Sequence, residues 1–369
     1  MRAQFQSSPF PLKTIEKLLK INYGKGLAAK QRDPDGTLPV YGSNGIIGFH
    51  SESITKSPTI VIGRKGSVGE VNFSSTPCWP IDTAFYIDEY PKDIAPKWLF
   101  YCLTNLQLGI HAQGPKPGIK RDLLYNISIP VPEDINEQRR IVARIEELTC
   151  RADEARKKAA EREAELDILL QALYCQMIEG VAWKPLKAVA SLVRRAVNTR
   201  LDEEYEEMGI RSFGKGTFKK PVLSGKQLGN KRIYRINEGD LVFNNVFAWE
   251  KAIAVAKAED HGRVGSHRFI TYVPHEGKAT SEFLCHHFLG ERGIEDIRAA
   301  SPGSAGRNRT LGLQKLEKIL VPVPDYDKQE RFSEIAKRRQ RVQQESFGIN
   351  EDVKTFYAAL LAKAFRGEL

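Results

Sequence analysis

Glycine-rich basic segments in the first third of the chain carry side chains suited to nucleic-acid contact. The segments VYGSNG, GRKGSVG and QGPKPGIKR place amide, hydroxyl and cationic groups between glycines. A glycine backbone can approach phosphates closely, an arginine can bond a guanine edge twice, and asparagine is the usual reader of adenine. A loop that leads into a helix also places backbone N–H groups toward phosphate. The predicted DNA-contacting residues here are Tyr41, Ser43, Asn44, Arg64, Lys65, Ser67, Gln113, Lys116, Lys120 and Arg121.

A second set of such residues lies in the third quarter of the chain, in FGKGTFKK, FNNVFAWEK, HRF and GRNR. Any one of these residues could equally be an ordinary solvated surface residue. As sets of loops, the pattern favours DNA contact. The predicted residues are Lys215, Lys219, Lys220, Asn244, Asn245, Trp249, Arg268, Arg307, Asn308 and Arg309.

Catalytic motifs were sought and none is convincing. A DNA methyltransferase needs an Asn/Asp-Pro-Pro-aromatic element, which is absent, and FGKGTF at Phe213 is a lone Gly-x-Gly turn. A loose nuclease spacing joins Asp325 to Asp352 and Lys354, but the last two flank a predicted helix seam. We therefore predict no catalytic residue in this chain.

The histidines and cysteines do not have the spacing of metal ligands. Adjacent histidines on a helix point in different directions, and no pair has the i, i+4 spacing. The five cysteines are scattered without a Cys-x-x-Cys pair, so neither disulfides nor zinc are expected. The residues considered were Cys285, His286, His287, His261, His267 and His275. We predict no metal site.

Length and charge bound the class of protein. The 369 residues suffice for two or three domains, and 41% apolar with 28% charged residues is typical of a globular protein. No apolar run is long enough for a membrane helix or a signal peptide, so we expect a cytoplasmic protein without membrane contact. Residues 1–128 hold 15 Lys and Arg against 10 Asp and Glu, and residues 181–320 hold 24 against 16. These two ranges together carry +13, whereas the whole chain carries +10, so the positive charge is confined to two separate ranges, as expected of two polyanion-binding modules.

The chain is an internal tandem duplication. IPVPEDINEQRRIVARIEEL begins at Ile129, and a degraded copy, VPVPDYDKQERFSEIAKRRQ, begins at Val321. Short strand-like runs separated by turns precede each copy, with Ile60, Val61, Ile62, Phe85 and Phe243 as predicted core. We divide the chain into a first β-rich domain (1–128), a first helix (129–180), a second β-rich domain (181–320) and a second helix (321–369).

Both helices carry an apolar residue every 3.5 positions, the pattern of a coiled-coil seam. Each begins after a Pro-x-Pro, and Gly180 and Gly367 are predicted stops. Each half supplies one helix, so the simplest closure pairs the two as an antiparallel coiled coil. The predicted seam and docking residues are Ile141, Ile145, Leu148, Leu166, Leu169, Leu173, Phe332, Ile335, Val342, Ile349, Val353, Phe356 and Leu360. The fold class is therefore α+β: two globular β-rich domains separated by two long helices, in a pseudo-two-fold internal repeat.

This alternation strongly resembles the specificity (S, HsdS-type) subunit of type I restriction–modification systems, over essentially the whole chain. The most specific segments are YGSNGIIGF, IVIGRKGSVG and WPIDTAFYI in the first half, and GRNRTLGLQKLEKILVPVP and LLAKAFRGEL in the second. The sequence departs from the pattern in its second helix opening, DKQERFSEIAKRR, and in LYCQMIEGV, where LLAKAFRGEL would be echoed.

The resemblance implies a non-catalytic subunit whose two β-rich domains are target recognition domains, each reading one half of a bipartite DNA sequence. It implies partners: double-stranded DNA, two methyltransferase subunits docked on the paired helices, and restriction/translocase subunits. AdoMet, ATP and Mg²⁺ would belong to those partners, with no cofactor in this chain. The alternatives are a specificity subunit of a modification-only or type IIB-like enzyme, a self-sufficient nuclease or methyltransferase, and a coiled-coil scaffold that does not bind DNA.

Overall fold

The structure is a computed structural model that describes residues 5, 7–112, 114, 117–303 and 309–369. The chain divides into two compact units, each made of two stretches of sequence. Unit 1 comprises residues 1–158 and 347–369, and unit 2 comprises residues 159–346. Each unit therefore contains one β-rich domain together with a segment of both long helices.

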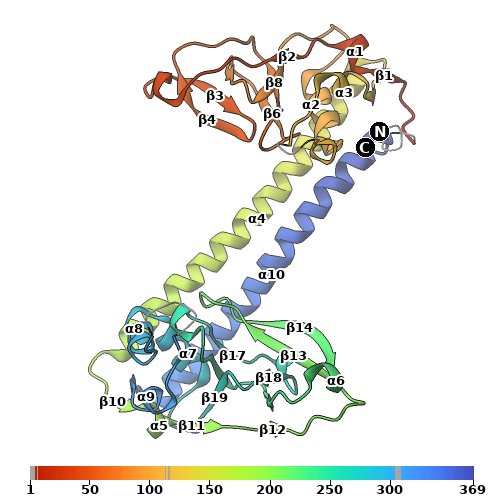
Figure 1. Cartoon of the computed structure of the whole chain (residues 1–369). Helices are drawn as coiled ribbons and strands as arrows, with labels where there is room; N and C mark the ends of the chain where they lie inside the picture. Colours follow the sequence, from red (N-terminus) through yellow and green to blue (C-terminus); the bar gives the residue numbers. More distant parts are fainter. Residues whose placement is uncertain (1–4, 6, 113, 115–116, 304–308) are drawn as a thin grey trace. The chain divides into compact units, whose positions relative to one another are not determined.

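The β-rich domain of unit 1 contains nine short strands and three α-helices within its described residues. In Figure 1 it is drawn in red to yellow. Its elements are β1 (Leu12–Thr14), α1 (Ile15–Leu18), β2 (Asn22–Tyr23), η2 (Ala29–Gln31), β3 (Leu38–Gly42), β4 (Gly45–His50), β5 (Thr59–Gly63), β6 (Val71–Ser74), β7 (Trp79–Pro80), β8 (Ala84–Ile87), α2 (Pro96–Asn105), η3 (Leu108–His111), α3 (Arg121–Tyr125) and β9 (Ser128–Pro130).

Among the described residues, the β-rich domain of unit 2 has more strands than that of unit 1, and it is drawn in green to light blue. Its elements are β10 (Trp183–Pro185), α5 (Leu186–Val189), β11 (Ala190–Val193), β12 (Ala196–Val197), β13 (Glu204–Ile210), β14 (Thr217–Ser224), α6 (Gly225–Leu228), β15 (Ile233–Arg235), β16 (Leu241–Asn244), η4 (Ala248–Glu250), β17 (Ile253–Val255), η5 (Ala258–Asp260), β18 (Val264–Ser266), β19 (Phe269–Pro274), α7 (Ser281–Leu289), α8 (Glu291–Ala299), α9 (Leu313–Leu316) and β20 (Leu320–Pro322).

The two units share one arrangement of antiparallel strands, which we call the frame. Unit 1 has a four-stranded sheet in the order β2-β8-β5-β6, and unit 2 has one in the order β11-β19-β16-β17. In each unit a further two-stranded pair, β1-β9 or β10-β20, joins the start of the domain to the Pro-x-Pro segment. The predicted internal repeat is thus present at the level of individual strand pairs.

The central strands of the frames are buried as their apolar sequence predicts. The side chains predicted as core are fully buried: Ile60, Val61, Ile62 and Phe243 are 0% exposed, and Phe85 is 1% exposed. A strand covered on both faces is expected to be apolar without alternation, as TIVIG is. The core of unit 1 extends from this sheet through α2 to the long helices.

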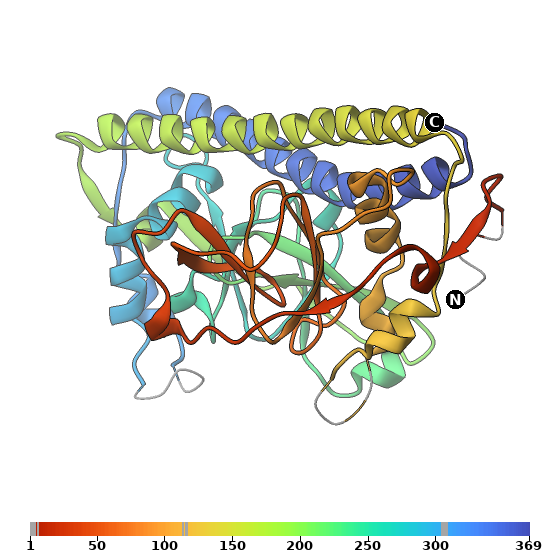
Figure 2. The same cartoon turned by 90° about the horizontal axis from the view of Figure 1, so that it is seen from above.

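Two long helices, α4 (Ile135–Ile178) and α10 (Tyr326–Phe365), follow the two Pro-x-Pro segments (Figure 2). Gly180 and Gly367 have φ of +68° and +72°, the left-handed conformation of a helix stop, as predicted. Among the described helices, none combines the length and apolar character that a bilayer crossing needs.

Within each unit the two helix segments pair antiparallel. In unit 2, Ser346 Oγ donates to the carbonyl of Ala159 at 3.3 Å, while Phe332, much earlier on α10, packs with Leu170 and Tyr174, later on α4. In unit 1, the apolar side chains at the start of α4 pack against those at the end of α10. The antiparallel coiled coil predicted from the seam is confirmed.

Polar residues that interrupt the seam pair across it. Arg339 Nε donates to Asp167 Oδ1 at 2.8 Å, and its Nη2 lies 3.4 Å from Glu163 Oε1. Ser346 is 6% exposed and also bonds the Val342 carbonyl of its own helix at 2.9 Å. These interruptions are therefore satisfied contacts within unit 2.

Two seam predictions are wrong. Leu169 is 44% exposed, and Leu170, at 4%, occupies the buried position instead. Phe356 is 37% exposed, whereas the neighbouring Tyr357 is half-buried. A straight helix drifts by about 20° per heptad relative to a strict 3.5-residue repeat, so a seam can move to the adjacent residue. Of the remaining predicted seam residues, those fully buried are Ile141, Ile145, Phe332, Val342, Val353 and Leu360, and those half-buried are Leu148, Leu166, Leu173, Ile335 and Ile349.

Candidate nucleic-acid interface

In unit 1, the turn after β5 and the segment before α3 are held side by side. The backbone N–H of Arg64 donates to the Thr83 carbonyl at 2.9 Å, and the Arg64 carbonyl accepts from Ile119 at 3.1 Å. Lys65 forms an isolated β-bridge with Gly118. These bonds bring GRKGSVG next to GIKR, although more than 50 residues separate them in sequence.

Glycine makes this close approach possible. A Cβ on Gly63 would lie 2.2 Å from the Ser67 carbonyl and 2.5 Å from that of Ser43. Gly66 has a φ of +77°, and a Cβ there would meet the Ser43 hydroxyl at 3.3 Å. The turn between β3 and β4 therefore joins the same surface region, with Ser43 half-buried and Asn44 exposed.

An aromatic side chain that sequence reasoning missed lies between the two arginines. Tyr23 is 50% exposed, with the guanidinium of Arg64 at 5.2 Å and that of Arg121 at 5.1 Å from its ring centroid. Within the described residues neither guanidinium has a carboxylate partner. The only signal was NYGKG, an aromatic residue beside a glycine in a basic stretch. Two uncompensated cations around one exposed aromatic ring form a surface suited to phosphates and base edges.

One predicted contact in unit 1 is wrong and two are not described. Tyr41 is 6% exposed and packs with Val61 in a small core cluster, and burial raises the pKa of its phenol. Its side chain is therefore part of the core and not of the exposed surface. Gln113 and Lys116 lie outside the described residues, whereas Ser67 is half-buried and Lys65 and Lys120 are exposed.

In unit 2, Asn245 occupies the position of Arg64. Its N–H donates to the Arg268 carbonyl at 2.8 Å, and its carbonyl accepts from Leu311 at 2.7 Å, the same two bonds that hold Arg64. The Oδ1 of Asn245 is buried without a partner among the described residues. Asn244 Oδ1 accepts from the N–H of Val246 at 3.1 Å, so this amide stabilises its own turn.

A cation and an aromatic ring also meet at this turn of unit 2. The guanidinium of Arg309 lies 5.0 Å from the centroid of Trp249, whose Nε1 donates to the Val246 carbonyl at 2.9 Å. Arg268 is exposed at the β18–β19 turn. Arg307 and Asn308, predicted from GRNR, lie outside the described residues.

The three predicted lysines of unit 2 differ in availability. Lys219 and Lys220 lie 3.6 Å from Glu259 and 3.9 Å from Glu207, so their charges are partly compensated. Lys215 is exposed at the tip of the β13–β14 hairpin. That tip is tied to the turn beside Trp249, because Gly214 donates to the Lys251 carbonyl at 3.0 Å.

Several side chains with a possible catalytic or metal-binding role form ion pairs or hydrogen bonds with other residues. Asp325 pairs with Lys328 at 3.2 Å, and Lys354 pairs with Glu351 at 2.8 Å, and all four residues are exposed. Over the part of the chain that the structure describes, no three potential ligands among His, Cys, Asp and Glu are grouped to hold a metal ion. His287 bonds Tyr174 Oη through Nδ1 at 2.7 Å, and burial lowers its pKa to about 4.

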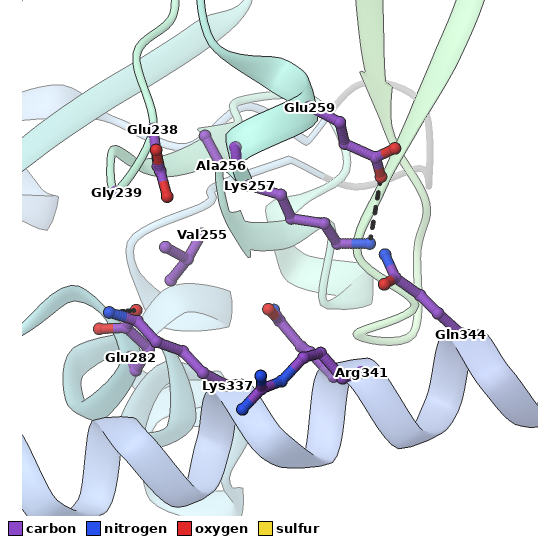
Figure 3. A pocket seen from close by; sticks show the side chains of 12 residues that line it. Glu238, Gly239, Val255, Ala256, Lys257, Glu259, Glu282, Lys337, Arg341 and Gln344 are labelled. Atoms are coloured by element: carbon purple, nitrogen blue, oxygen red, sulfur yellow. Dashed lines mark ion pairs between the residues drawn. The ribbon is translucent and has the colours of Figure 1, made fainter.

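A hollow in unit 2 beside α10 is lined in part by two ion pairs. Lys257 lies 3.8 Å from Glu259, and Lys337 lies 3.4 Å from Glu282 (Figure 3). The carboxylates of Glu259 and Glu282 therefore already have cationic partners. None of the predicted DNA-contacting residues lines it.

Comparison with known proteins agrees with this arrangement. Residues 8–162 match the family model described as the type I restriction modification DNA specificity domain. No curated protein sequence matches the chain. Residues 8–162 thus carry a type I restriction modification DNA specificity domain.

Solved structures show the same fold over nearly the whole chain. A crystal structure of the type I restriction-modification system S subunit from M. genitalium has a TM-score of 0.62 at 14% identity, covering 97% of this chain and 96% of that one. A chain from a structural study of complex assembly and conformational transition of the type I R-M system has a TM-score of 0.56 at 17% identity, covering 98% and 99%. The shared fold therefore includes both β-rich domains and both long helices.

Proposed function

We propose that this chain reads a two-part DNA sequence, with one half-site contacted by each β-rich domain. The observation that carries the proposal is the equivalence of Arg64 and Asn245, each held by the same two backbone bonds at the same turn of the same sheet frame. Arginine suits a guanine edge and asparagine an adenine edge. One frame thus presents a different reading side chain in each unit.

In unit 1, the contact set is the turn after β5, the segment before α3 and Tyr23. Arg64, Lys65, Lys120 and Arg121 supply cations without carboxylate partners among the described residues. In unit 2, the set is Asn245, Arg268, and the Trp249–Arg309 pair, with Lys215 on the adjacent hairpin tip. Phosphate contacts would position each domain, and the few base-edge contacts would give specificity.

The chain directs catalytic partners rather than acting alone. We propose two methyltransferase subunits docked on the paired helices, joined by restriction/translocase subunits, with AdoMet, ATP and Mg²⁺ held by those partners. Apolar side chains on the helix surfaces support docking: Ile168 is 71% exposed on α4, and Phe347 is 68% exposed on α10. A large apolar side chain exposed on a helix is typical of a binding surface when others lie nearby. A modification-only or type IIB-like complex would use the same subunit and is the second candidate.

Selection from randomised double-stranded DNA tests the reading function. The purified full-length chain, at low salt, is expected to enrich two short half-sites separated by a fixed number of unspecified base pairs. Enrichment of no sequence would contradict the proposal and favour a scaffold. AdoMet- or Mg²⁺-dependent turnover by the chain alone would favour a self-sufficient enzyme instead.

A further inference from the structure

Each long helix begins with a fully buried glutamine that bonds its own β-rich domain. On α4, Gln138 is 0% exposed. Its Nε2 donates to the carbonyls of Asp93 at 2.8 Å and Pro132 at 3.0 Å, and its Oε1 accepts from the N–H of Ala95 at 2.9 Å. Ala95 is the N-cap of α2, so one amide joins the helix, the Pro-x-Pro segment and the domain.

Unit 2 repeats this arrangement. Gln329 on α10 is also 0% exposed. Its Nε2 donates to the carbonyls of Lys278 at 3.0 Å and Pro324 at 2.9 Å, and its Oε1 accepts from the N–H of Thr280 at 3.1 Å. Thr280 is the N-cap of α7. The same three-bond joint thus occurs twice, in units whose additional sheets differ.

The physical consequence is a fixed angle between helix and domain. Three directional bonds from one planar amide define an orientation, which apolar packing alone does not. Loss of the amide would leave two carbonyls and one N–H without these partners, which is costly wherever water cannot replace them. Burial also keeps water from replacing these bonds while the helix tilts.

We propose that Gln138 and Gln329 are positioning residues that set the angle at which each long helix leaves its reading domain, and thereby restrict the gap allowed between the two half-sites. This inference rests on the proposed two-part DNA recognition. Neither glutamine lies among the predicted DNA-contacting residues, so each acts on the gap and not on the bases. If one joint loosens, its domain samples several orientations and accepts neighbouring gap lengths.

The test compares gap selectivity with half-site preference. Full-length chains carrying Gln138→Met or Gln329→Met are offered a DNA library with fixed half-sites and variable gaps. Methionine has nearly the length of glutamine but lacks its hydrogen bonds. The matched controls are Gln176→Met on α4 and Gln344→Met on α10, because both glutamines are exposed.

We expect each joint variant to reduce the preference for the best gap over gaps one base pair longer or shorter by about tenfold, the order of magnitude set by losing the hydrogen bonds of the joint. The half-site sequences and the controls should be unchanged. A merely structural role would lower the thermal stability or the yield while leaving the gap preference sharp, and that result would overturn the inference. A changed half-site sequence would overturn it as well.

A second variant tests the inference if the methionine substitution prevents folding. Gln138→Glu keeps the shape and an acceptor for Ala95 but loses both donated bonds. We expect the same broadening of the gap preference, and an unbroadened preference in this folded variant would overturn the inference. Failure of the wild-type chain to select a two-part site would instead contradict the proposed function, so the two failures are distinguishable.

Discussion

Units 1 and 2 share a frame but differ in what is built upon it. Both have the same four-stranded sheet, the same strand pair before the Pro-x-Pro segment and the same buried glutamine. The second sheet has three strands, β4-β3-β7, in unit 1 and five, β12-β15-β18-β13-β14, in unit 2. The shared elements fix the position of the turn that carries Arg64 in unit 1 and Asn245 in unit 2. The sheets that differ can vary the DNA sequence that each domain recognises.

The two units also differ in how some of their predicted DNA-contacting cations are paired. In unit 1 the arginines surround Tyr23 without carboxylate partners among the described residues. In unit 2, Lys219 and Lys220 already have glutamates nearby. Unit 1 is thus expected to contribute more of the phosphate-based affinity per cation than unit 2.

The largest expected effect comes from exchanging one reading domain. Replacing residues 10–128 with another recognition domain should change one half of the methylated sequence completely and leave the other half intact, because each frame is complete within its own unit. Sequencing of methylated positions in cells that also carry the methyltransferase partner measures this. If both halves changed together, the division into two readers would be wrong.

Salt dependence should follow the uncompensated cations. With on the order of 6–10 phosphate contacts, affinity should fall about 10³–10⁵-fold between 50 and 200 mM salt. The double variant Lys65→Gln and Lys120→Gln should lower the slope of log affinity against log salt by about two. Lys219→Gln with Lys220→Gln should change it less. Fluorescence anisotropy with one DNA duplex gives all three slopes, and equal changes from both double variants would remove the proposed difference between the units.

Single substitutions at the equivalent turn positions should act on separate half-sites. Arg64→Ala should relax one base preference in one half-site, and Asn245→Ala one in the other, each by about 1–3 kcal/mol of discrimination. Binding to DNA panels with single base changes measures the loss. A uniform fall in affinity with unchanged preference would reassign the residue to phosphate contact.

The effect furthest from DNA recognition concerns acid stability, where unit 2 has a buried histidine. Burial lowers the pKa of His287 to about 4 from an ordinary value of 6.5, so the folded chain leaves it neutral while the unfolded chain takes up a proton. Its contribution to stability is complete above about pH 6.5 and declines as the pH falls to 4, by about 3 kcal/mol in total.

The variant His287→Gln should make this decline shallower, because glutamine can still accept a bond from Tyr174 but does not titrate. Exposed His267→Gln is the control. Denaturant unfolding at pH 7, 5.5 and 4.5 measures the decline. An unchanged pH dependence in His287→Gln would show that this buried imidazole does not control it.

Sequence periodicity was sufficient for the helices and the repeat, but not for side chains whose neighbours come from distant segments. By sequence alone, Leu169 and Leu170 fit an apolar seam equally well. The drift of a straight helix determines which of the two is buried. Tyr41 resembled a loop contact because its inward position on β3 depends on pairing with β4 and β7. The glutamine is visible in both copies of the repeated segment, but its partners are backbone carbonyl and N–H groups, which sequence does not single out.

The most direct test of a two-reader protein joined by paired helices is the gap length after both helices are extended. Ser346 bonds Ala159 across the pair, so heptads inserted after Ala159 and before Ser346 enter at the same level and keep the seam in phase. Seven residues add about 10 Å at 1.5 Å per residue, or about three base pairs at 3.4 Å each. The gap selected by the full-length variant should lengthen by about three base pairs, with both half-sites unchanged. A folded, DNA-binding variant that selects the original gap would contradict the account.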